Sequence, residues 1–493
     1  MDILILTGYS GFTQRTHSIL RLLKKDLKIN SINCLVMGGH NYKYLKSQKD
    51  FEYNNLIHID NLLRDLEKNS SKKLLSEYEN EINKVESFLN ISINKILFSE
   101  RVLIQHTHNL IYKKKLSQNQ IICIFFGLYY ELEKLVKNNS VVVTYTSASL
   151  TSEILYYLCK AYKKQYLTLN ETRVSNKWSV IDNNIDYHRE IDEIYKKLLE
   201  PSEDGKNLYF KYLNNLKENK KNIIEQNYQI ELLNSKKINF KNIYRFIRNL
   251  ILIKNKDTHF LSPDKKTKII RNIVYYKNIF LTKNIAENKI PKEKYLYLPL
   301  SVIPEASTLI RGQIYYDQLS LIKRISLELP SNYVLLVRDH PAMLGLNTYS
   351  FYKEIKKMYN VKLINPKYNN NEIIMKAEAV ITVTGTSGLE SLFLGKKTIV
   401  LGKSIYSTLK SVYHLDNLSY LKNILQKKHD EKIKKDQEAD LQKFTTAICM
   451  SKCVDDKDLV LWTKKSFISN TIDIDFGFKE VLKNLIIDDK TTY

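Results

Sequence analysis

The sequence predicts an α/β protein with parallel sheets. Residues 333–402 carry three short apolar runs, at 333–337, 379–384 and 398–401, separated by segments with helical spacing of apolar residues. Strands that alternate with helices form βαβ units, and these units build parallel sheets. The N-terminus repeats the pattern, beginning with an apolar run at 2–7. Two such regions in one chain predict two domains of the Rossmann type.

The predicted elements divide the chain into four parts. Residues 1–200 form an N-terminal domain, and residues 201–290, which are rich in Lys and Asn, form a helical linker or insertion. Residues 291–435 form the second domain. Residues 436–493 are again helical, and we expect the helix predicted at 475–487 to pack back on the first domain.

Each predicted element follows from its apolar period. The apolar runs that we read as further strands are 31–37, 56–59, 140–144, 165–169 and 294–300. The segments with helical spacing are 16–25, 73–118, 312–328 and 350–358.

Composition limits the functions that the chain can have. Its 493 residues, 43% of them hydrophobic, allow two or three domains with sizeable cores. Five scattered cysteines argue against a disulfide framework. The N-terminal residues read as a strand and not as a signal peptide, and no apolar run approaches the roughly eighteen residues of a membrane-spanning helix. We therefore expect a cytoplasmic protein.

The chain is strongly basic. It has 77 Lys and Arg against 53 Asp and Glu, a net charge of +24. Much of the surplus is Lys in a background rich in Asn, Ile and Tyr, which is typical of an AT-rich genome. The charge otherwise suits a nucleic-acid binder, an enzyme with anionic substrates or a protein on an anionic membrane. No motif that reads nucleic acid is present, so we expect no nucleic-acid partner.

A turn of small residues follows the apolar run at 379–384. Gly385, Thr386, Ser387 and Gly388 combine free helix N–H groups, close backbone approach and two hydroxyls, which together suit a phosphate. The turn is not a Walker A loop, because no Gly-Lys-Ser/Thr follows at the required spacing. The alternative is an ordinary turn that caps a helix.

A second polar group follows the run at 333–337. Arg338, Asp339, His340 and Pro341 stand at the end of a strand that we expect to neighbour the strand at 379–384. His340 can add a hydrogen-bond donor or a proton to a phosphate there, whereas alternation along the strand points Asp339 to the opposite face. The alternative is a strand-end histidine with a structural role.

Several motifs together resemble the capsular polysaccharide biosynthesis family. They are Leu298-Pro299-Leu300, Pro304-Glu305, Arg338 to Pro341, Thr384 to Ser391, and Gly395 to Thr398. Members of that family resemble GT-B glycosyltransferases that take 2-ulosonic acids, such as Kdo or nonulosonic acids, from CMP-sugars. The His-Pro pair and the Ser-containing turn also resemble motifs of bacterial sialyltransferases that face the CMP phosphate and cytidine. The resemblance covers residues 295–402 well and residues 1–185 weakly.

The resemblance implies a GT-B-like fold, with the parallel sheets of two Rossmann-like domains facing a cleft and a helical insertion between them. It implies a CMP-sugar donor on the second domain. The residues expected to bind the donor are Glu305, Arg338, Asp339, His340, Pro341, Gly385, Thr386, Ser387, Gly388 and Glu390.

The first domain then supplies the acceptor side. In a GT-B protein the turn at Gly8 and Gly11 faces the acceptor, although such a pair elsewhere is a simple tight turn, and Ser147 lies in a loop expected to line the cleft. Glu171 is the expected catalytic base, and Arg173 is expected to pair with a sugar carboxylate. The alternative is a structural Glu–Arg pair.

The other candidates for the base are Glu153 and Asp182. We expect no cofactor and no metal ligands, because Asp473 and Asp475 lie far from the sheet unit and read as a helix start. The expected partners are a nucleotide sugar and a glycan or lipid-linked glycan acceptor. The alternatives are a UDP-sugar transferase or epimerase on the same fold, and a basic protein that binds membrane or nucleic acid.

Residues 236–256 raise the question of membrane contact. They form an amphipathic, cationic pattern with Phe240, Ile243, Phe246 and Leu250 on one face. Such a helix lies on an anionic membrane, or it is a core helix whose basic residues are solvated. The first reading predicts peripheral attachment to the inner face of the cytoplasmic membrane.

Overall fold

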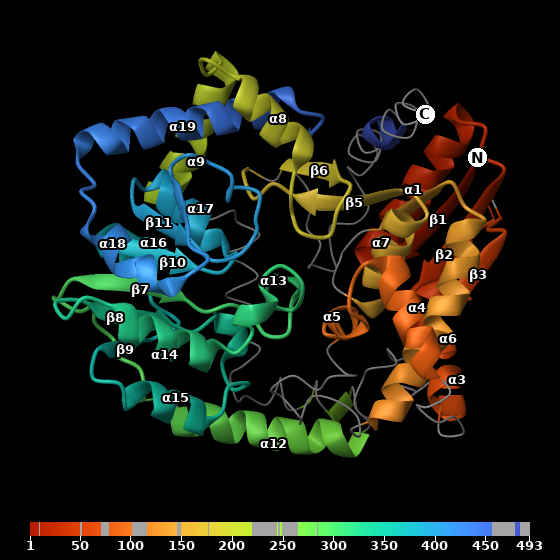
Figure 1. Ribbon diagram of the computed structural model, residues 1–493, viewed down its shortest axis with the longest axis horizontal. Coiled ribbons are helices and arrows are strands. Elements are labelled where there is room, and N and C mark those ends of the chain that lie inside the picture. The colour runs from red at the N-terminus through yellow and green to blue at the C-terminus, as the bar shows by residue number, and fades with distance from the viewer. Residues whose placement is uncertain are drawn as a thin grey trace.

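The fold is described from a computed structural model of the chain (Figure 1). The residues that it describes are 1–8, 10–49, 52–70, 78–100, 116–144, 149–175, 177–218, 244, 247–248, 265–282, 284–455 and 479–483.

The first domain is built on a sheet with strand order β13-β6-β5-β4-β1-β2-β3. Strands β1 to β5 are parallel, and β6 and β13 extend the β5 edge in antiparallel pairing. The strands are β1 Asp2–Thr7, β2 Ser31–Val36, β3 Asn55–His58, β4 Val141–Thr144, β5 Gln165–Glu171, β6 Lys177–Ile181 and β13 Val454–Asp455.

Helices cover both faces of this sheet. They are α1 Ser10–Asp26, α2 Gly39–Ser47, α3 Ile59–Ser70, α4 Glu79–Leu89, α5 Ile93–Leu97, α6 Gln118–Lys137 and α7 Leu150–Ala161. Along β1, Leu4 and Leu6 enter one hydrophobic core and Ile3 and Ile5 enter the other. A strand buried on both faces reads as a continuous apolar run, as β1 does.

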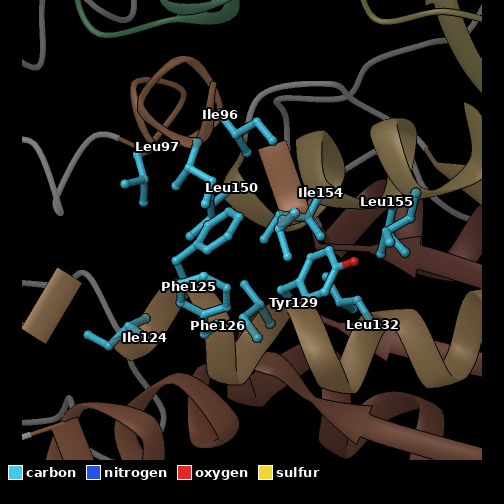
Figure 2. Packing of buried hydrophobic residues seen from close by; sticks show 14 of the residues in the cluster. Ile96, Leu97, Ile124, Phe125, Phe126, Tyr129, Leu132, Leu150, Ile154 and Leu155 are labelled. Atoms are coloured by element: carbon cyan, nitrogen blue, oxygen red, sulfur yellow. The ribbon is translucent and has the colours of Figure 1, made fainter. Parts of the chain in front are cut away.

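The larger of these two cores fixes the start of α7. Figure 2 shows Phe125 and Tyr129 of α6 packed against Leu150 and Ile154 of α7, with Ile96 of α5 beside them. All five side chains are buried. The first turn of α7, which follows the C-terminal end of β4, is therefore held rigidly at the edge of the first sheet.

The second domain is built on a fully parallel sheet with strand order β12-β11-β10-β7-β8-β9. Its strands are β7 Tyr295–Pro299, β8 Val334–Arg338, β9 Val361–Ile364, β10 Ala379–Thr382, β11 Lys397–Val400 and β12 Val412–His414. The two parallel sheets confirm the predicted fold class of two Rossmann-like domains.

The helices that follow α7 pack on the second sheet or beside it (Figure 1). They are α8 Arg189–Lys197, α9 Glu203–Lys217, α12 Lys265–Thr282, α13 Ala306–Leu309, α14 Gln318–Glu328, α15 Tyr349–Lys356, α16 Asn370–Lys376, α17 Thr386–Phe393, α18 Leu421–Gln426 and α19 Glu431–Met450. Short 3₁₀ helices, among them η4 Pro341–Met343, connect some of the strands and helices. No helix in the described ranges is long and apolar enough to cross a bilayer.

The domain limits differ from those predicted. Helices α8 and α9, placed by the sequence in the first domain and in an insertion, share one core with α17 and α19 of the second domain. Tyr209 of α9 stacks on Phe393 of α17 with ring centroids 5.3 Å apart. The chain therefore leaves the first domain between β6 and α8, earlier than the predicted limit near residue 200.

The chain also returns to the first domain. After α19, β13 pairs with β6 of the first sheet, beside the place where the chain left it. Farther on, Leu482 is buried in the core beneath β1, and Lys479 Nζ lies 2.6 Å from Asp26 Oδ2. The first domain thus contains both the beginning and the end of the described chain.

Some local predictions were wrong. The stretch 73–118 was read as continuously helical, but α4 ends at Asn90, whose φ of 52° is left-handed, and α5 is a separate short helix. Strands β6 and β9 were missed. Strand β7 lies between β8 and β10, so the strands that lead to His340 and Gly385 are not neighbours.

Candidate active site

The predicted phosphate turn lies where β10 ends and α17 begins. The N–H of Gly385 donates to Thr382 Oγ1 at 3.1 Å, which turns the chain out of the strand and into the helix. Thr386 is exposed and Ser387 is half-buried, so both stand at the open end of α17. The first N–H groups of a helix have no partner within it, and the helix dipole favours an anion there.

Gly388 is required by packing and not by a ligand. A Cβ at this position would lie 2.4 Å from Tyr406 Oη and 2.8 Å from Thr382 Cγ2. Tyr406 donates its hydroxyl to the carbonyl of Gly385, which holds the turn from below. The expected close approach of Gly388 to a phosphate is therefore corrected: the protein itself fills that space.

Glu390 lies beneath the turn and is buried. Asn370 Nδ2 donates to Glu390 Oε2 at 2.5 Å and lies 3.1 Å from Ser387 Oγ. Tyr297 donates to Asn370 Oδ1 at 2.6 Å and fixes the amide. The expected contact of Glu390 with the nucleotide is corrected to a supporting one, because Glu390 positions Ser387 through Asn370.

Arg338 and Asp339 also support the local structure. Arg338 Nη2 donates to the carbonyl of Pro366 at 2.7 Å. Asp339 is 1% exposed and accepts from Asn347 Nδ2 at 3.0 Å and from the hydroxyl of Tyr352. Asp339 thus faces the interior, as alternation along the strand predicted. Neither side chain is placed as the expected direct donor contact.

His340 caps the turn that follows β8. Its Nδ1 accepts from the N–H of Ala342 at 3.1 Å, and Pro341 begins the 3₁₀ helix η4. Because Nδ1 accepts, the ring proton of the neutral side chain is on Nε2. His340 can therefore donate through Nε2 while it holds its own loop. Glu305 is exposed and precedes α13 at another strand end of the same sheet.

The acceptor-side candidates are only partly described. Gly8 follows β1, and a Cβ there would lie 2.8 Å from Met37 Cβ, so glycine lets the chain pass the end of β2. Gly11 lies inside α1, not in a turn before it, because the helix begins at Ser10. Ser147 lies outside the described residues.

Arg173 has a different partner from the one expected. Its Nη2 lies 2.6 Å from Asp186 Oδ2, and its Nη1 donates to the carbonyl of Thr384 at 2.5 Å. Its φ of 64° is left-handed, so the backbone is held in an unusual shape to make these bonds. Glu171 is exposed at the end of β5. Arg173 therefore joins the two domains, and its expected pairing with a sugar carboxylate is corrected.

Asp186 is the centre of a buried charge cluster that the sequence analysis missed. It is 1% exposed and lies 2.6 Å from Arg173, 3.2 Å from Arg311 and 3.2 Å from His188. Burial alone would raise the pKa of Asp186, but the charges of Arg311 and Arg173 outweigh burial and hold the pKa well below its usual range. Arg311 follows α13 of the second domain, so Asp186 links both domains.

A signal for this cluster was present in the sequence. Residues 182–188 follow the apolar run of β6 and contain two Asp, two Asn and a His. Such a polar stretch at a strand end is typical of a site loop. The analysis stopped at Trp178 because it did not read 177–181 as a strand.

Glu153 lies in the first turn of α7, near this cluster. It is 3% exposed, its Oε2 accepts from Asn184 Nδ2 at 2.8 Å, and its Oε1 has no hydrogen-bond partner in the described structure. Burial raises the pKa of Glu153 to about 8, although the Asn184 bond and the charge of Arg311 act in the opposite direction. A carboxyl with this pKa, beside a domain boundary, is suited to proton transfer.

Two further buried polar atoms near the same boundary have no partner among the described residues. They are Arg311 Nε and Thr384 Oγ1. The backbone of Arg311 lies close to the end of β10, because a Cβ on Gly402 would lie 2.7 Å from Thr384 Cγ2 and 3.1 Å from Arg311 O. Buried polar atoms usually find partners, so these atoms are candidates to bind a substrate.

Asp182, the other candidate base, is half-exposed and lies 2.9 Å from Arg189 in an ion pair at the surface. Asp473 and Asp475 lie outside the described residues. Across the part of the chain that is described, no three His, Cys, Asp or Glu side chains come together as a metal site requires.

Two Rossmann-like domains with polar side chains gathered where strand ends meet define a protein of the GT-B type. Residues 220–409 match the family model of the capsule polysaccharide biosynthesis proteins. This match confirms, over that segment, the family resemblance carried by the motifs. No curated protein matches the chain significantly.

Solved structures with a related fold include several sugar-nucleotide enzymes. The Thermosulfurimonas dismutans KpsC, beta Kdo 2,7 transferase, is 14% identical, with 68% of this chain and 82% of that chain covered and a TM-score of 0.30. The UDP-GlcNAc 2-epimerase from Methanocaldococcus jannaschii is 14% identical, with 87% and 94% covered and a TM-score of 0.24. At such low scores these similarities say nothing about the reaction.

Proposed function

We propose that this protein is a glycosyltransferase of capsule or lipopolysaccharide synthesis that moves a 2-ulosonic acid from a CMP-sugar to a surface glycan acceptor. The sugar would be of the Kdo, pseudaminic, legionaminic or sialic type. The observation that carries the proposal is the open N-terminus of α17, which begins beside the carbonyl of Thr384 that Arg173 of the first domain binds. A donor phosphate at this end of α17 would therefore lie next to the first domain.

In the proposed reaction, the bond between the anomeric carbon and the phosphate oxygen of the donor breaks as the acceptor oxygen bonds to that carbon. The negative charge that develops on the departing CMP is stabilised by the N–H groups of α17 and by the hydroxyls of Thr386 and Ser387. His340 adds a donor through Nε2. We propose that these groups act without a metal ion or a cofactor.

The acceptor hydroxyl loses its proton to a carboxylate of the first domain. Glu171 remains the proposed base on the strength of its place at the end of β5, and Glu153 is the alternative that the structure adds. Glu153 has an oxygen without a described partner and a pKa of about 8, so a fraction of it is ionised at neutral pH. Glu171 is exposed, and water competes for its protons.

We extend the proposal to location. A lipid-linked or membrane-proximal glycan acceptor and a net charge of +24 favour a cytoplasmic protein that lies on the inner face of the cytoplasmic membrane. The proposed partners are then the nucleotide sugar, the glycan acceptor and anionic lipid, without nucleic acid.

The test is a calorimetric titration with CMP, UDP and their sugars. We expect binding of CMP, a loss of about tenfold in affinity when Ser387→Ala removes one hydroxyl, and no change in Ser350→Ala, a serine on α15. Binding of UDP-sugars with no binding of CMP-sugars would instead identify the UDP-sugar transferase or epimerase. Unchanged CMP affinity in Ser387→Ala would remove this turn from the site.

A further inference from the structure

Helix α12, Lys265–Thr282, has an apolar face that the described structure leaves exposed. The exposed side chains, here called the α12 stripe, are Ile269, Ile270, Ile273, Phe280 and Leu281. Ile273 is 64% exposed and Phe280 is 78% exposed. Single exposed apolar residues are common, but five on one helix are not.

The stripe occupies one side of the helix. At about 100° per residue, its five members lie within an arc of about 120° around the axis. Lys277 is exposed within the same arc. A lysine in such a place can lay its apolar stem along the stripe and keep its charge outside.

The opposite side of α12 is fixed to the second domain. Asn278 is buried and its Nδ2 donates to the carbonyl of Gly345 at 3.2 Å. A Cβ on Gly345 would lie 2.7 Å from Tyr275 Cε2 and 2.9 Å from Ile279 Cγ1, so the two chains are in close contact. The apolar stripe is therefore not turned outward by chance, because the packing of the other face determines its direction.

The charge of α12 indicates what covers the stripe. The helix contains five basic residues and no acidic one. Figure 1 shows it along the lower rim of the molecule, away from both sheets. An apolar stripe on a helix whose charges are all positive is complementary to an anionic lipid surface, where acyl chains meet negative headgroups.

We propose that α12 is the surface by which this protein docks on an anionic membrane. The α12 stripe enters the boundary between headgroups and acyl chains, and the basic residues of the helix contact the headgroups. The inference rests on the membrane part of the proposed function and not on the reaction. It differs from the earlier expectation for residues 236–256, most of which lie outside the described residues.

The proposal is tested by flotation of the full chain with vesicles of phosphatidylcholine alone or with added phosphatidylglycerol. We expect flotation only with the anionic vesicles, and most strongly at low salt. The double variant Ile273→Asp/Phe280→Asp should lower the bound fraction by about tenfold. The matched control is Leu327→Asp on α14, because Leu327 is 83% exposed and lies on another helix.

Three outcomes would overturn the proposal. The first is a wild-type chain that never floats with anionic vesicles, and the second is equal flotation of the double variant and the wild type. The third is a wild-type dimer in light scattering that the double variant converts to a monomer, because the stripe would then bind a second copy. CMP binding, measured on the same variants, separates these results from a failure of the proposed reaction.

Discussion

Arg311 Nη1, which belongs to the second domain, lies 3.2 Å from Asp186 Oδ2 of the first-domain loop. The same oxygen lies 2.6 Å from Arg173 Nη2. One buried carboxylate thus holds two guanidinium groups from different domains. The relative placement of the domains depends on this carboxylate, because without it two positive charges would face each other away from water.

The first prediction concerns stability. Asp186→Asn should lower the free energy of unfolding by about 3–5 kcal/mol, since it leaves two buried guanidinium groups without a counter-charge. Urea unfolding at neutral pH measures the loss. The control is Asp182→Asn, which breaks a surface pair with Arg189 and should cost about 1 kcal/mol or less. Equal losses in the two variants would show that the Asp186 cluster is not a structural link.

The second prediction concerns pH. Burial raises the pKa of Glu153 to about 8, from a model value of 4.5, so the folded chain keeps a proton that the unfolded chain releases between these values. This contribution to stability is complete below the unfolded pKa and is lost as the pH rises through the folded pKa. Its slope is about 1.4 kcal/mol per pH unit in that window.

Glu153→Gln cannot ionise, so its free energy of unfolding relative to the wild type should rise steadily between about pH 5 and pH 8. Glu354→Gln is the control, because Lys357 lowers the pKa of Glu354 and places its titration below this window. Parallel stability curves for Glu153→Gln and the wild type would mean that Glu153 is ionised in the folded protein.

The third prediction concerns the turn before α17. Gly388→Ala should lower the free energy of unfolding by about 1–3 kcal/mol, because the new methyl group meets Tyr406 Oη. Tyr406→Phe removes that oxygen, so Gly388→Ala should cost less in a Tyr406→Phe background. A thermal or urea double-mutant cycle gives the coupling. Strictly additive effects would contradict the packing role of Gly388.

The fourth prediction separates the two roles of His340. His340→Ala should lower turnover of the donor by about 10²-fold, in the range of positioned acid–base groups. His340→Asn keeps an acceptor for the N–H of Ala342 but has no group in the place of Nε2. We therefore expect His340→Asn to restore stability and not turnover. Recovery of the rate by asparagine would reduce His340 to a cap of η4.

The sequence predicted the strands that are short, apolar and buried on both faces, such as β1, β4 and β8. It missed β9, where Lys362 interrupts a run of only four residues, and β6, an edge strand with polar residues at alternate positions. Local pattern cannot tell such edge strands from loops, because their partners lie far along the chain.

The candidate site was predictable where chemistry follows a strong strand. The turn at Gly385 and the polar residues after β8 were found in this way. Asp186 and Arg311 were missed because each becomes a site residue only through a partner more than a hundred positions away. For the same reason the sequence gave Arg173 the wrong partner, since nothing local distinguishes a link between domains from a ligand contact.

The two places where the chain passes between the domains lie side by side. The N–H of Lys452, on the return, donates to Glu190 Oε2 at 3.3 Å, next to the outward passage, and the pairing of β13 with β6 ties the two passages together. A single connection would let one domain swivel in any direction about the other. Two connections fixed to each other act as the two pins of a hinge and leave one axis of rotation. Substrate can then enter only from the side opposite that axis, where α17 and the Asp186 cluster would separate first.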